Sequence, residues 1–596
     1  MPARVFSLSS GKPGLSSCLP SIEPLIVAIP CTADRDPYNP LLSCWLGPDE
    51  YVYTPLDLQV EPILKTHPKA HLIVKITTCS PEWWDLLHEE EMVFSDDGIS
   101  SCLLGEGCTK KKVPSLASDL WQETMNLNVR RLVRHIESAP YADHVIGYTA
   151  SFGHKGSWTR FGTYKGFPWD FNPKMTRRFQ KWLTKQYPHA AALSKAWGRS
   201  LDFGEALPPA PAEMACVAPT GFRHPVAQRP CIDYLLFLAH LAAETIGSLA
   251  ATVKESCNDR ALFGVPYGNF LDLLKVQNGL QQSSQLGLAH VLRNEQVDFL
   301  MAPAGTLPTD PGLSAAFSTA PETSVRLHDK LLFHGWDKSH APETACTFAR
   351  QHGLGIWWEE ESWNSAPDHA GAAVAEASMQ RFFRHAPSFP AGRRKIALVI
   401  DDLSMLFIQR VPEQLDALIT GQIRELCRAG LAFDTLLVND LTDSSPYCFL
   451  IFPNLFFADR ERRESIHRQL RRSRATALWL VAPGFVEEEP LFENIENLTG
   501  IRVRKPEHPH NAVVAYDKGA EKMTYGLPDM FAHTPVIEDE ECRILGTYLD
   551  SDLPGLGVKE QQGWRSIYSG APAVSADLLY RFAVEAGAVP SRGDLS

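Results

Sequence analysis

The stretch His71-Leu-Ile-Val-Lys-Ile76, followed directly by Thr77-Thr-Cys-Ser-Pro-Glu-Trp-Trp84, decides the fold class. Its first part is short and rich in β-branched residues, which is typical of a β-strand. Its second part is polar and aromatic, and it begins where the strand ends. The same succession of a short apolar run, a polar loop and a longer amphipathic segment recurs from residue 21 to about residue 390. Strands that alternate with helices indicate parallel βαβ units.

Further elements of this rhythm can be placed on the sequence. The other predicted strands are 24–30, 144–148, 262–265, 297–301, 331–333 and 355–358. The predicted helices are 120–138, 173–187 and 231–256. So many units in one region favour a (β/α)8 TIM barrel with insertions over a single open sheet. We therefore predict a TIM-barrel domain at 21–390.

A second α/β domain is predicted after this barrel. Residues 387–394 contain two prolines, a glycine and two arginines, which indicates a linker. Residues 395–400 then form a continuous apolar run, as expected for a strand buried on both faces. Further strands at 449–452 and 477–481 alternate with helices at 411–429 and 459–472. This pattern predicts a flavodoxin-like, doubly wound domain at 395–560.

The two ends of the chain are expected to lie outside these domains. Residues 1–20 are rich in Ser, Gly and Pro, which predicts a disordered N-terminus. Residues 561–596 show weak periodicity and are predicted to form a C-terminal tail.

Charge and composition argue against several kinds of partner, cofactor and location. The formal net charge of -13 disfavours nucleic acid as a partner, because an acidic surface repels phosphate groups. The 13 cysteines contain no C-x-x-C pair, which argues against a zinc site or a disulfide framework and favours a cytoplasmic protein. No run of apolar residues reaches the roughly 18 that a membrane span needs. No phosphate-binding glycine loop or metal-ligand cluster is found, so we expect no cofactor.

Tryptophans gather where predicted strands end. Functional residues of a barrel lie at the carboxyl ends of its strands, and indole rings stack on the apolar faces of sugars. The predicted substrate-binding residues are Trp83, Trp84, Trp158, Trp336 and Trp358. Core packing is the alternative for each of them.

Several of these segments resemble one known family. Ser80-Pro-Glu-Trp-Trp84 with Asp97-Gly98 resembles the Pro-x-Trp-Trp…Asp-Gly stretch of glycoside hydrolase family 42-like proteins, the β-galactosidase-like barrels. Val145-Ile-Gly-Tyr148 with Gly156-Ser-Trp158 resembles their fourth strand and the loop after it. The resemblance extends over about residues 25–560. It implies that the ligand is a carbohydrate or a glycosylated small molecule.

The second predicted domain takes part in the same resemblance. Ala397-Leu-Val-Ile-Asp-Asp-Leu-Ser404 and Phe452-Pro-Asn-Leu-Phe456 resemble the glutaminase-like (class I glutamine amidotransferase-like) domain that follows the barrel in this family. The strand that would carry a catalytic cysteine ends in Leu480-Val-Ala-Pro-Gly484, so amidotransferase chemistry is not expected. Relatives use this domain mainly for oligomer contacts, which leaves a homo-oligomer open here.

The departures from the family concern its chemistry. A retaining glycosidase uses two carboxyl groups about 5–5.5 Å apart, one as acid/base and one as nucleophile. The resemblance places Ser157 at the acid/base position and Gly335 at the nucleophile position. A serine hydroxyl cannot act as a general acid near neutral pH. Asp337 and Glu360 lie close enough in sequence to the expected positions to be the candidate catalytic carboxylates.

Two interpretations stay open from the sequence. The first is a glycoside hydrolase that acts on a glycoside or an oligosaccharide with non-standard carboxylates. The second is a non-catalytic carbohydrate-binding or structural descendant of a β-galactosidase-like enzyme. Carboxylate distances in the barrel mouth would separate them.

Overall fold

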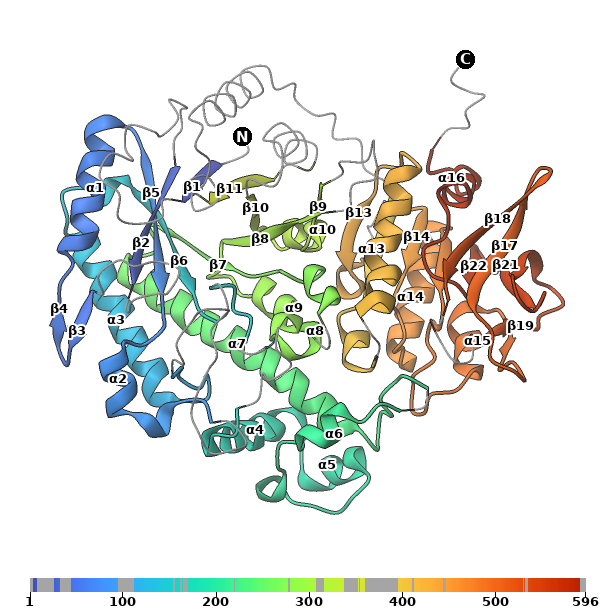
Figure 1. The fold of residues 1–596 in the computed structure, drawn as a ribbon, viewed down its shortest axis with the longest axis horizontal. Coiled ribbons are helices and arrows are strands. Elements are labelled where there is room, and N and C mark those ends of the chain that lie inside the picture. Colours follow the sequence, from blue (N-terminus) through green and yellow to red (C-terminus); the bar gives the residue numbers. More distant parts are fainter. Residues whose placement is uncertain are drawn as a thin grey trace.

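The structure is a computed structural model, in which two sheet-centred units lie side by side (Figure 1). The residues that it describes are 4–7, 26–32, 44–94, 112–153, 156–160, 163, 170–218, 220–276, 279–306, 316–336, 352, 354–359, 395–409, 412–442, 446–528, 530 and 534–589. The predicted linker at 387–394 lies outside these ranges.

The first unit is built on eight parallel strands. They are β1 (Arg4–Ser7), β2 (Ile26–Thr32), β5 (His71–Thr77), β6 (Val145–Ser151), β7 (Leu262–Pro266), β8 (Phe299–Thr306), β10 (Leu331–Trp336) and β11 (Gly355–Glu359). They are ordered β10-β11-β1-β2-β5-β6-β7-β8, and β8 also pairs with β10 in parallel, which closes the sheet on itself. The predicted α/β class with a curled parallel sheet is confirmed, and its topology is consistent with a TIM barrel.

The N-terminal prediction was wrong at one place. Residues 4–7 form strand β1, which pairs with both β11 and β2. Arg4-Val-Phe-Ser7 is too short and too polar to show a period of its own. The strand forms because the backbones of β2 and β11 on either side supply its hydrogen bonds. Backbone hydrogen bonds of this kind do not depend on the side chains, so the sequence does not reveal them.

Alternation of side chains along the strands divides the apolar residues of the barrel into two layers. One cluster contains Ile26, Ala28, Ile73, Phe299, Met301, Phe333 and Trp357. The alternate residues, such as Val27 and Leu72, belong to a larger cluster with the helices. Gly264 of β7 makes room for the first cluster, because a Cβ there would lie 2.2 Å from the Phe299 ring. We infer that the first cluster fills the inside of the barrel.

Most of the barrel helices contribute buried apolar residues to the larger cluster. The helices of this unit are α1 (Thr54–Thr66), α2 (Glu82–Leu87), α3 (Asp119–Glu137), α4 (Pro173–Gln186), α5 (Ala190–Trp197), α6 (Pro211–Ala215), α7 (Arg229–Ser256), α8 (Gly279–Gln282), α9 (Leu288–Leu292) and α10 (Glu322–Leu327). The predicted helices 120–138, 173–187 and 231–256 correspond to α3, α4 and α7. Short strands β3 (Trp45–Gly47) and β4 (Glu50–Tyr51) form a hairpin, and β9 (Ala316–Ser318) pairs antiparallel with β8.

Helix α7 is the one helix in the described ranges that is long and apolar enough to cross a membrane. Of its most apolar window, 67% is buried inside the protein. It packs against α3 and β7, so a place in the core accounts for its composition.

The second unit contains a mixed nine-stranded sheet. Five strands run parallel in the order β13 (Asp434–Leu437), β12 (Ile396–Ile400), β14 (Phe449–Phe452), β15 (Thr476–Leu480) and β22 (Trp564–Ser569). An antiparallel part follows with β21 (Pro554–Gln561), β20 (Arg543–Tyr548), β17 (Ala512–Lys518) and β18 (Glu521–Leu527). Its helices are α13 (Pro412–Arg428), α14 (Arg460–Ser473), α15 (Glu493–Thr499) and α16 (Ala576–Glu585), and β16 (Val503–Arg504) pairs with β19 (Val536–Ile537).

The predicted boundary at residue 560 was wrong. Strand β22 lies beyond it, in the middle of the sheet between β15 and β21, and α16 packs on α13. The sequence hides β22 because Ser566 and Ser569 interrupt its apolar residues, although both serines are fully buried. Ser566 accepts a hydrogen bond from Trp479 and donates one to the carbonyl of Thr499, which explains a serine at that depth.

The two units share one hydrophobic cluster. Phe222, from the segment between α6 and α7, packs against Phe456 and Phe485 of the second unit, with ring centroids 5.2 and 5.4 Å apart. The guanidinium of the neighbouring Arg223 is buried and donates to the carbonyl of Leu406 at 2.9 Å. The two sheets therefore belong to one packed body.

Candidate functional site

Four of the predicted site positions, Trp83, Trp84, Ser157 and Trp158, are described, and they follow the carboxyl ends of barrel strands β5 and β6. The loops that the structure describes on this rim of the barrel follow β5, β6 and β7, and they comprise residues 78–85, 152–153 with 156–160, and 267–271. Asp337, Glu360 and the side chains of Trp336 and Trp358 lie outside the described parts. Their predicted roles therefore stay predictions.

Ser157 lies in a tight loop after β6. Gly153 and Gly156 adopt left-handed backbone angles (φ 80° and 72°), which glycine accommodates without strain. A Cβ at Gly153 would lie 2.3 Å from the carbonyl oxygen of Thr159, so the loop closes tightly on itself. The Ser157 hydroxyl donates to the Thr159 hydroxyl at 3.0 Å. The acid/base position of the resemblance thus holds a neutral hydroxyl that bonds its own loop.

Trp158 is not a wall of an open pocket, contrary to the prediction. Its indole is 1% exposed, donates to the carbonyl of Ala150 at 3.0 Å and packs 5.7 Å from the Phe152 ring. Its backbone is left-handed (φ 58°), a strained conformation for a residue with a bulky side chain. The turn after the strand directs the indole back toward the core, which strand-end position alone could not reveal.

Trp83 and Trp84 differ in exposure, although both lie in α2. Trp84 is buried beside His88, whereas Trp83 is half-buried. The Trp83 ring meets Trp45 edge-on at 4.8 Å, and its N–H reaches the Trp45 carbonyl at 3.4 Å. Of these two, Trp83 keeps the more accessible ring for a ligand.

The ends of β10 and β11 were expected to carry the nucleophile. Gly335 lies in register with Trp357 on one side and with Pro303 on the other. Trp357 is 1% exposed, and Lys75 lies over its ring at 5.6 Å. Gly335, which the resemblance assigns to the nucleophile position, supplies no side chain at this level of the strand.

His334 is buried one residue before this position. Burial lowers its pKa to about 4, so the imidazole is neutral at physiological pH. Nearby, Glu322 acts to raise this pKa and His352 acts to lower it. The Nδ1 of His352 lies 2.7 Å from the Oε2 of Glu322. This environment is that of a core histidine, in agreement with a structural role.

Two polar residues on this rim were not among the predicted site residues. Asn269 follows β7 and is 4% exposed, and its Oδ1 accepts no hydrogen bond from the described residues. Arg160 closes the Ser157 loop, and its Nη1 likewise lacks a described partner. Burial lowers the pKa of the Arg160 guanidinium, against the opposing effects of Tyr234 and Asp170. Asn269 could have been predicted as a site residue, because it is a polar residue that follows the end of the predicted strand 262–265.

A polar segment joins these two loops. Residues 281–285, Gln-Gln-Ser-Ser-Gln, are all buried, although such a run is typical of a surface loop. The Gln285 amide donates to the Ser157 carbonyl at 2.7 Å and accepts from the Gly268 backbone at 3.0 Å. Ser284 has a left-handed backbone (φ 76°), and the Tyr267 hydroxyl bonds its carbonyl. The rim between β6 and β7 is therefore rigid and polar.

Two buried carboxyl groups near the rim form hydrogen bonds with protein groups. Burial raises the pKa of Asp85 to about 7, and the Ser80 hydroxyl donates to it at 2.5 Å. Asp170 accepts from the Ser115 hydroxyl at 2.5 Å and from the Asn172 backbone at 3.0 Å, and burial raises its pKa. The Asp85 carboxyl thus bonds within its own segment, whereas the Asp170 carboxyl links its segment to Phe94 and Ser115.

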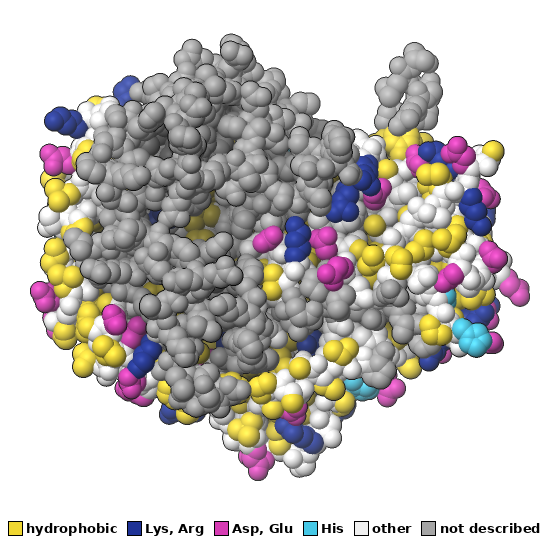
Figure 2. All heavy atoms as spheres, in the orientation of Figure 1, with side chains coloured by type: hydrophobic (Ala, Val, Ile, Leu, Met, Phe, Trp, Pro, Cys, Tyr) yellow, Lys and Arg dark blue, Asp and Glu magenta, His cyan; other side chains and the backbone are white. Residues whose placement is uncertain are grey.

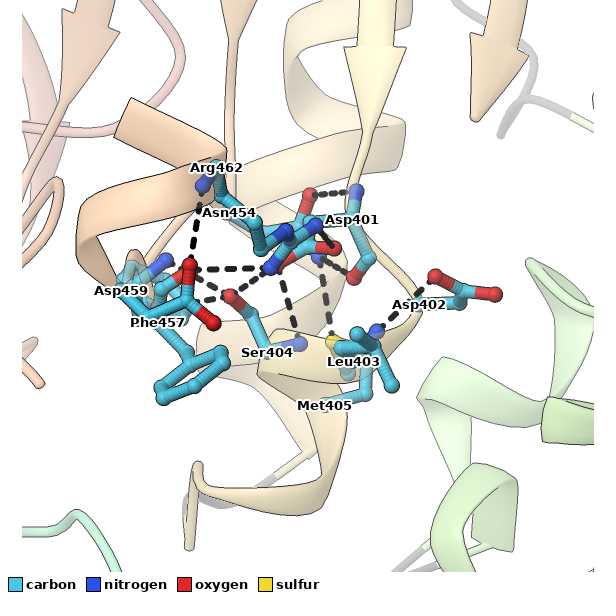
Figure 3. A network of polar contacts seen from close by, with 10 residues as sticks. Asp401, Asp402, Leu403, Ser404, Met405, Asn454, Phe457, Asp459 and Arg462 are labelled. Atoms are coloured by element: carbon cyan, nitrogen blue, oxygen red, sulfur yellow. Dashed lines mark hydrogen bonds and ion pairs between the residues drawn. The ribbon is translucent and has the colours of Figure 1, made fainter. Parts of the chain in front are cut away.

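The strand order of the second unit reverses between β12 and β14. Ligands of open α/β sheets bind outside the strand ends at such points. Figure 3 shows Asp401, Asn454, Ser404 and Arg462 pointing toward one another there, with Asp402 directed away. Asp401 bonds both Nη atoms of Arg462, at 2.5 and 3.1 Å, so protein groups occupy this position themselves.

The strand end that would carry a glutaminase nucleophile has a left-handed residue, Val481 (φ 66°). Such a strained turn after a strand is the setting of a nucleophile elbow. Valine offers no nucleophile, and Tyr568 and Ser569 hold its backbone by hydrogen bonds.

Charged side chains of both signs are mixed on one face of the molecule. Figure 2 shows Lys and Arg interspersed with Asp and Glu on the face that it presents. Among the described side chains of that face, no large patch of a single charge is present.

No family model and no curated protein matches the chain. Solved structures do. The β-galactosidase from the psychrophilic Marinomonas ef1 has a TM-score of 0.65 at 13% identity, covering 99% of this chain and 92% of that chain. The β-galactosidase from the haloarchaeon Halorubrum lacusprofundi has 0.63 at 14%, covering 98% and 90%. Gan42B, a GH42 β-galactosidase, has 0.63 at 14%, covering 90% and 80%. The chain therefore has a glycoside hydrolase family 42-like fold.

Proposed function

We propose that this chain is a glycoside hydrolase-like protein that binds a glycoside or an oligosaccharide at the barrel mouth, with the usual hydrolytic carboxylates replaced. One observation carries the proposal. Ser157, which the resemblance assigns to the acid/base position, bonds Thr159 of its own loop, and the buried side chains of Arg160 and Asn269 on the same rim keep polar atoms without described partners.

The polar groups support sugar binding. Buried atoms without partners are rare in proteins, and a ligand hydroxyl would satisfy the Oδ1 of Asn269 and the Nη1 of Arg160. Trp83 would supply an apolar ring face beside β5. The alternative is a descendant with a purely structural role, in which these atoms have no ligand.

Binding is tested by titrating the purified chain with a β-galactoside, followed by calorimetry or tryptophan fluorescence. We expect saturable binding at millimolar concentration or below, weakened about tenfold by Asn269→Ala because a buried hydrogen bond is lost. Asn497→Ala, an exposed residue of α15, is the matched control and should bind as wild type does. Absence of binding to wild type would favour the structural alternative.

Activity is tested on aryl β-galactosides. We expect turnover far below an ordinary glycosidase rate, because general acid catalysis alone contributes about 10²–10⁴ in rate. Ser157→Glu should not lower whatever activity exists. Turnover of several molecules per second by wild type would contradict the proposal. If turnover then disappeared in Asp337→Asn and Glu360→Gln, the enzyme with non-standard carboxylates would be the correct interpretation.

We further propose that the second unit is a flavodoxin-like, glutaminase-like domain. The parallel order β13-β12-β14-β15-β22 is the order 2-1-3-4-5 of such domains, which supports the assignment. A homo-oligomer in the cytoplasm remains part of this proposal, and light scattering of the purified chain would measure its oligomeric state.

A further inference from the structure

Two cysteine thiols contact each other at the carboxyl end of β2. Cys31 is the penultimate residue of β2, and Cys44 directly precedes β3. Their sulfur atoms lie 3.1 Å apart, and the residues are 4% and 6% exposed. A disulfide bond is about 2.05 Å long, so a movement of roughly 1 Å would suffice to join them. We infer that Cys31 and Cys44 form a reversible disulfide when the chain meets hydrogen peroxide.

The two thiols are not equivalent. Their mutual hydrogen bond is the largest influence on both: it raises the pKa of Cys31 and lowers the pKa of Cys44. The thiolate is the reactive form of cysteine. Cys44, which is also the slightly more exposed of the two (6% against 4%), is therefore assigned as the thiol that attacks first, and Cys31 as the thiol that then closes the disulfide.

The surroundings suit a small oxidant. Both thiols line a cavity of about 30 Å³, together with Trp45, Tyr53 and Met125. A space of this size accommodates a molecule such as water or peroxide, whereas a bulky disulfide reagent does not fit.

The chemistry balances with peroxide as the oxidant. The Cys44 thiolate attacks one peroxide oxygen, the O–O bond breaks, and a sulfenic acid forms as hydroxide leaves and takes up a proton to become water. The Cys31 sulfur then attacks the Cys44 sulfur, the S–O bond breaks, and the hydroxyl leaves as a second water with the Cys31 proton. Two thiols are oxidised and one peroxide is reduced.

This bond would act on the barrel rim. Trp45 follows Cys44 and packs on Trp83 at 4.8 Å and on Trp84 at 6.4 Å. Oxidation would therefore fasten the segment that carries Trp45 to a barrel strand, beside the half-buried Trp83. Tryptophan fluorescence should report the change, independently of any sugar binding.

The test uses the full chain, first reduced and then treated with a few equivalents of hydrogen peroxide. Free thiols are blocked with N-ethylmaleimide, and peptides are mapped by mass spectrometry without reduction. We expect a Cys31–Cys44 cross-link in most of the chain, which dithiothreitol reverses. Cys216→Ser, which removes an exposed cysteine, is the control and should keep the cross-link. Alkylation of both thiols after oxidation of Cys216 would overturn the inference.

Single variants test the order of the steps. In Cys31→Ser the Cys44 sulfenic acid should be trapped, so that dimedone added together with denaturant labels it, whereas in Cys44→Ser the Cys31 thiol should stay unlabelled. Labelling in the opposite sense would overturn the assignment of Cys44 as the attacking thiol. If a variant fails to fold, the mapping of the wild-type chain still decides whether the cross-link forms.

Discussion

At the scale of single residues, the buried ion pair of Asp401 and Arg462 should stabilise the fold far more than an exposed ion pair does. The Asp401 side chain is fully buried and that of Arg462 is 12% exposed. Arg462→Ala would leave a buried carboxylate without its partner, which typically costs about 3–5 kcal/mol. We expect the urea midpoint of the whole chain to fall accordingly. Arg460→Ala in the same helix breaks an exposed pair with Glu464 and should leave the midpoint unchanged. Equal effects of the two variants would contradict this account.

Asp402, next in the chain, gives a pH-dependent prediction. Burial, together with the neighbouring Asp401 carboxylate, raises the pKa of Asp402 to about 7. The unfolded carboxyl has a pKa near 3.9, so the folded state binds more protons between about pH 4 and 7, and stability falls as pH rises through that window. Asp402→Asn should therefore stabilise the chain by about 2–4 kcal/mol at pH 8 and by little at pH 4. Urea midpoints at both pH values would measure this, and a gain independent of pH would refute it.

The element scale shows what the sequence could predict. Strands such as 71–76 and 449–452 could be predicted because they are continuous runs of apolar or β-branched side chains. Strands β1, β13 and β22 were missed because they are short or contain buried serines, and their positions depend on partners far away in sequence. For the site, strand ends located Ser157 and Trp83. They could not show that Trp158 turns into the core, or that residues 281–285 are buried.

One prediction belongs to the packing of the barrel strands. A methyl group at Gly264 would meet the Phe299 ring of β8, so Gly264→Ala should destabilise the barrel by about 1–3 kcal/mol through overpacking. Adding Phe299→Leu should recover part of that loss, because the two sites are in contact and their effects are not additive. Gly204→Ala, where a Cβ would meet nothing within 4 Å, is the control. Thermal denaturation would rank the three variants, and a neutral Gly264→Ala would contradict the close contact.

At the scale of the whole molecule, the junction of the two units predicts how the chain unfolds. Phe222 inserts between aromatic rings of the second unit, and the buried Arg223 donates to its backbone, so each unit completes the other's core. We therefore expect wild type to unfold in a single calorimetric transition. Phe222→Ala removes a buried aromatic side chain, which costs about 3–5 kcal/mol, and this loss falls on the junction. The transition should then split into two, one for each unit. Phe171→Ala, at a phenylalanine that is 39% exposed, should keep the single transition. Two transitions already present in wild type would show that the shared cluster does not couple the units, and an unsplit, unshifted transition in Phe222→Ala would show that this ring does not hold them together.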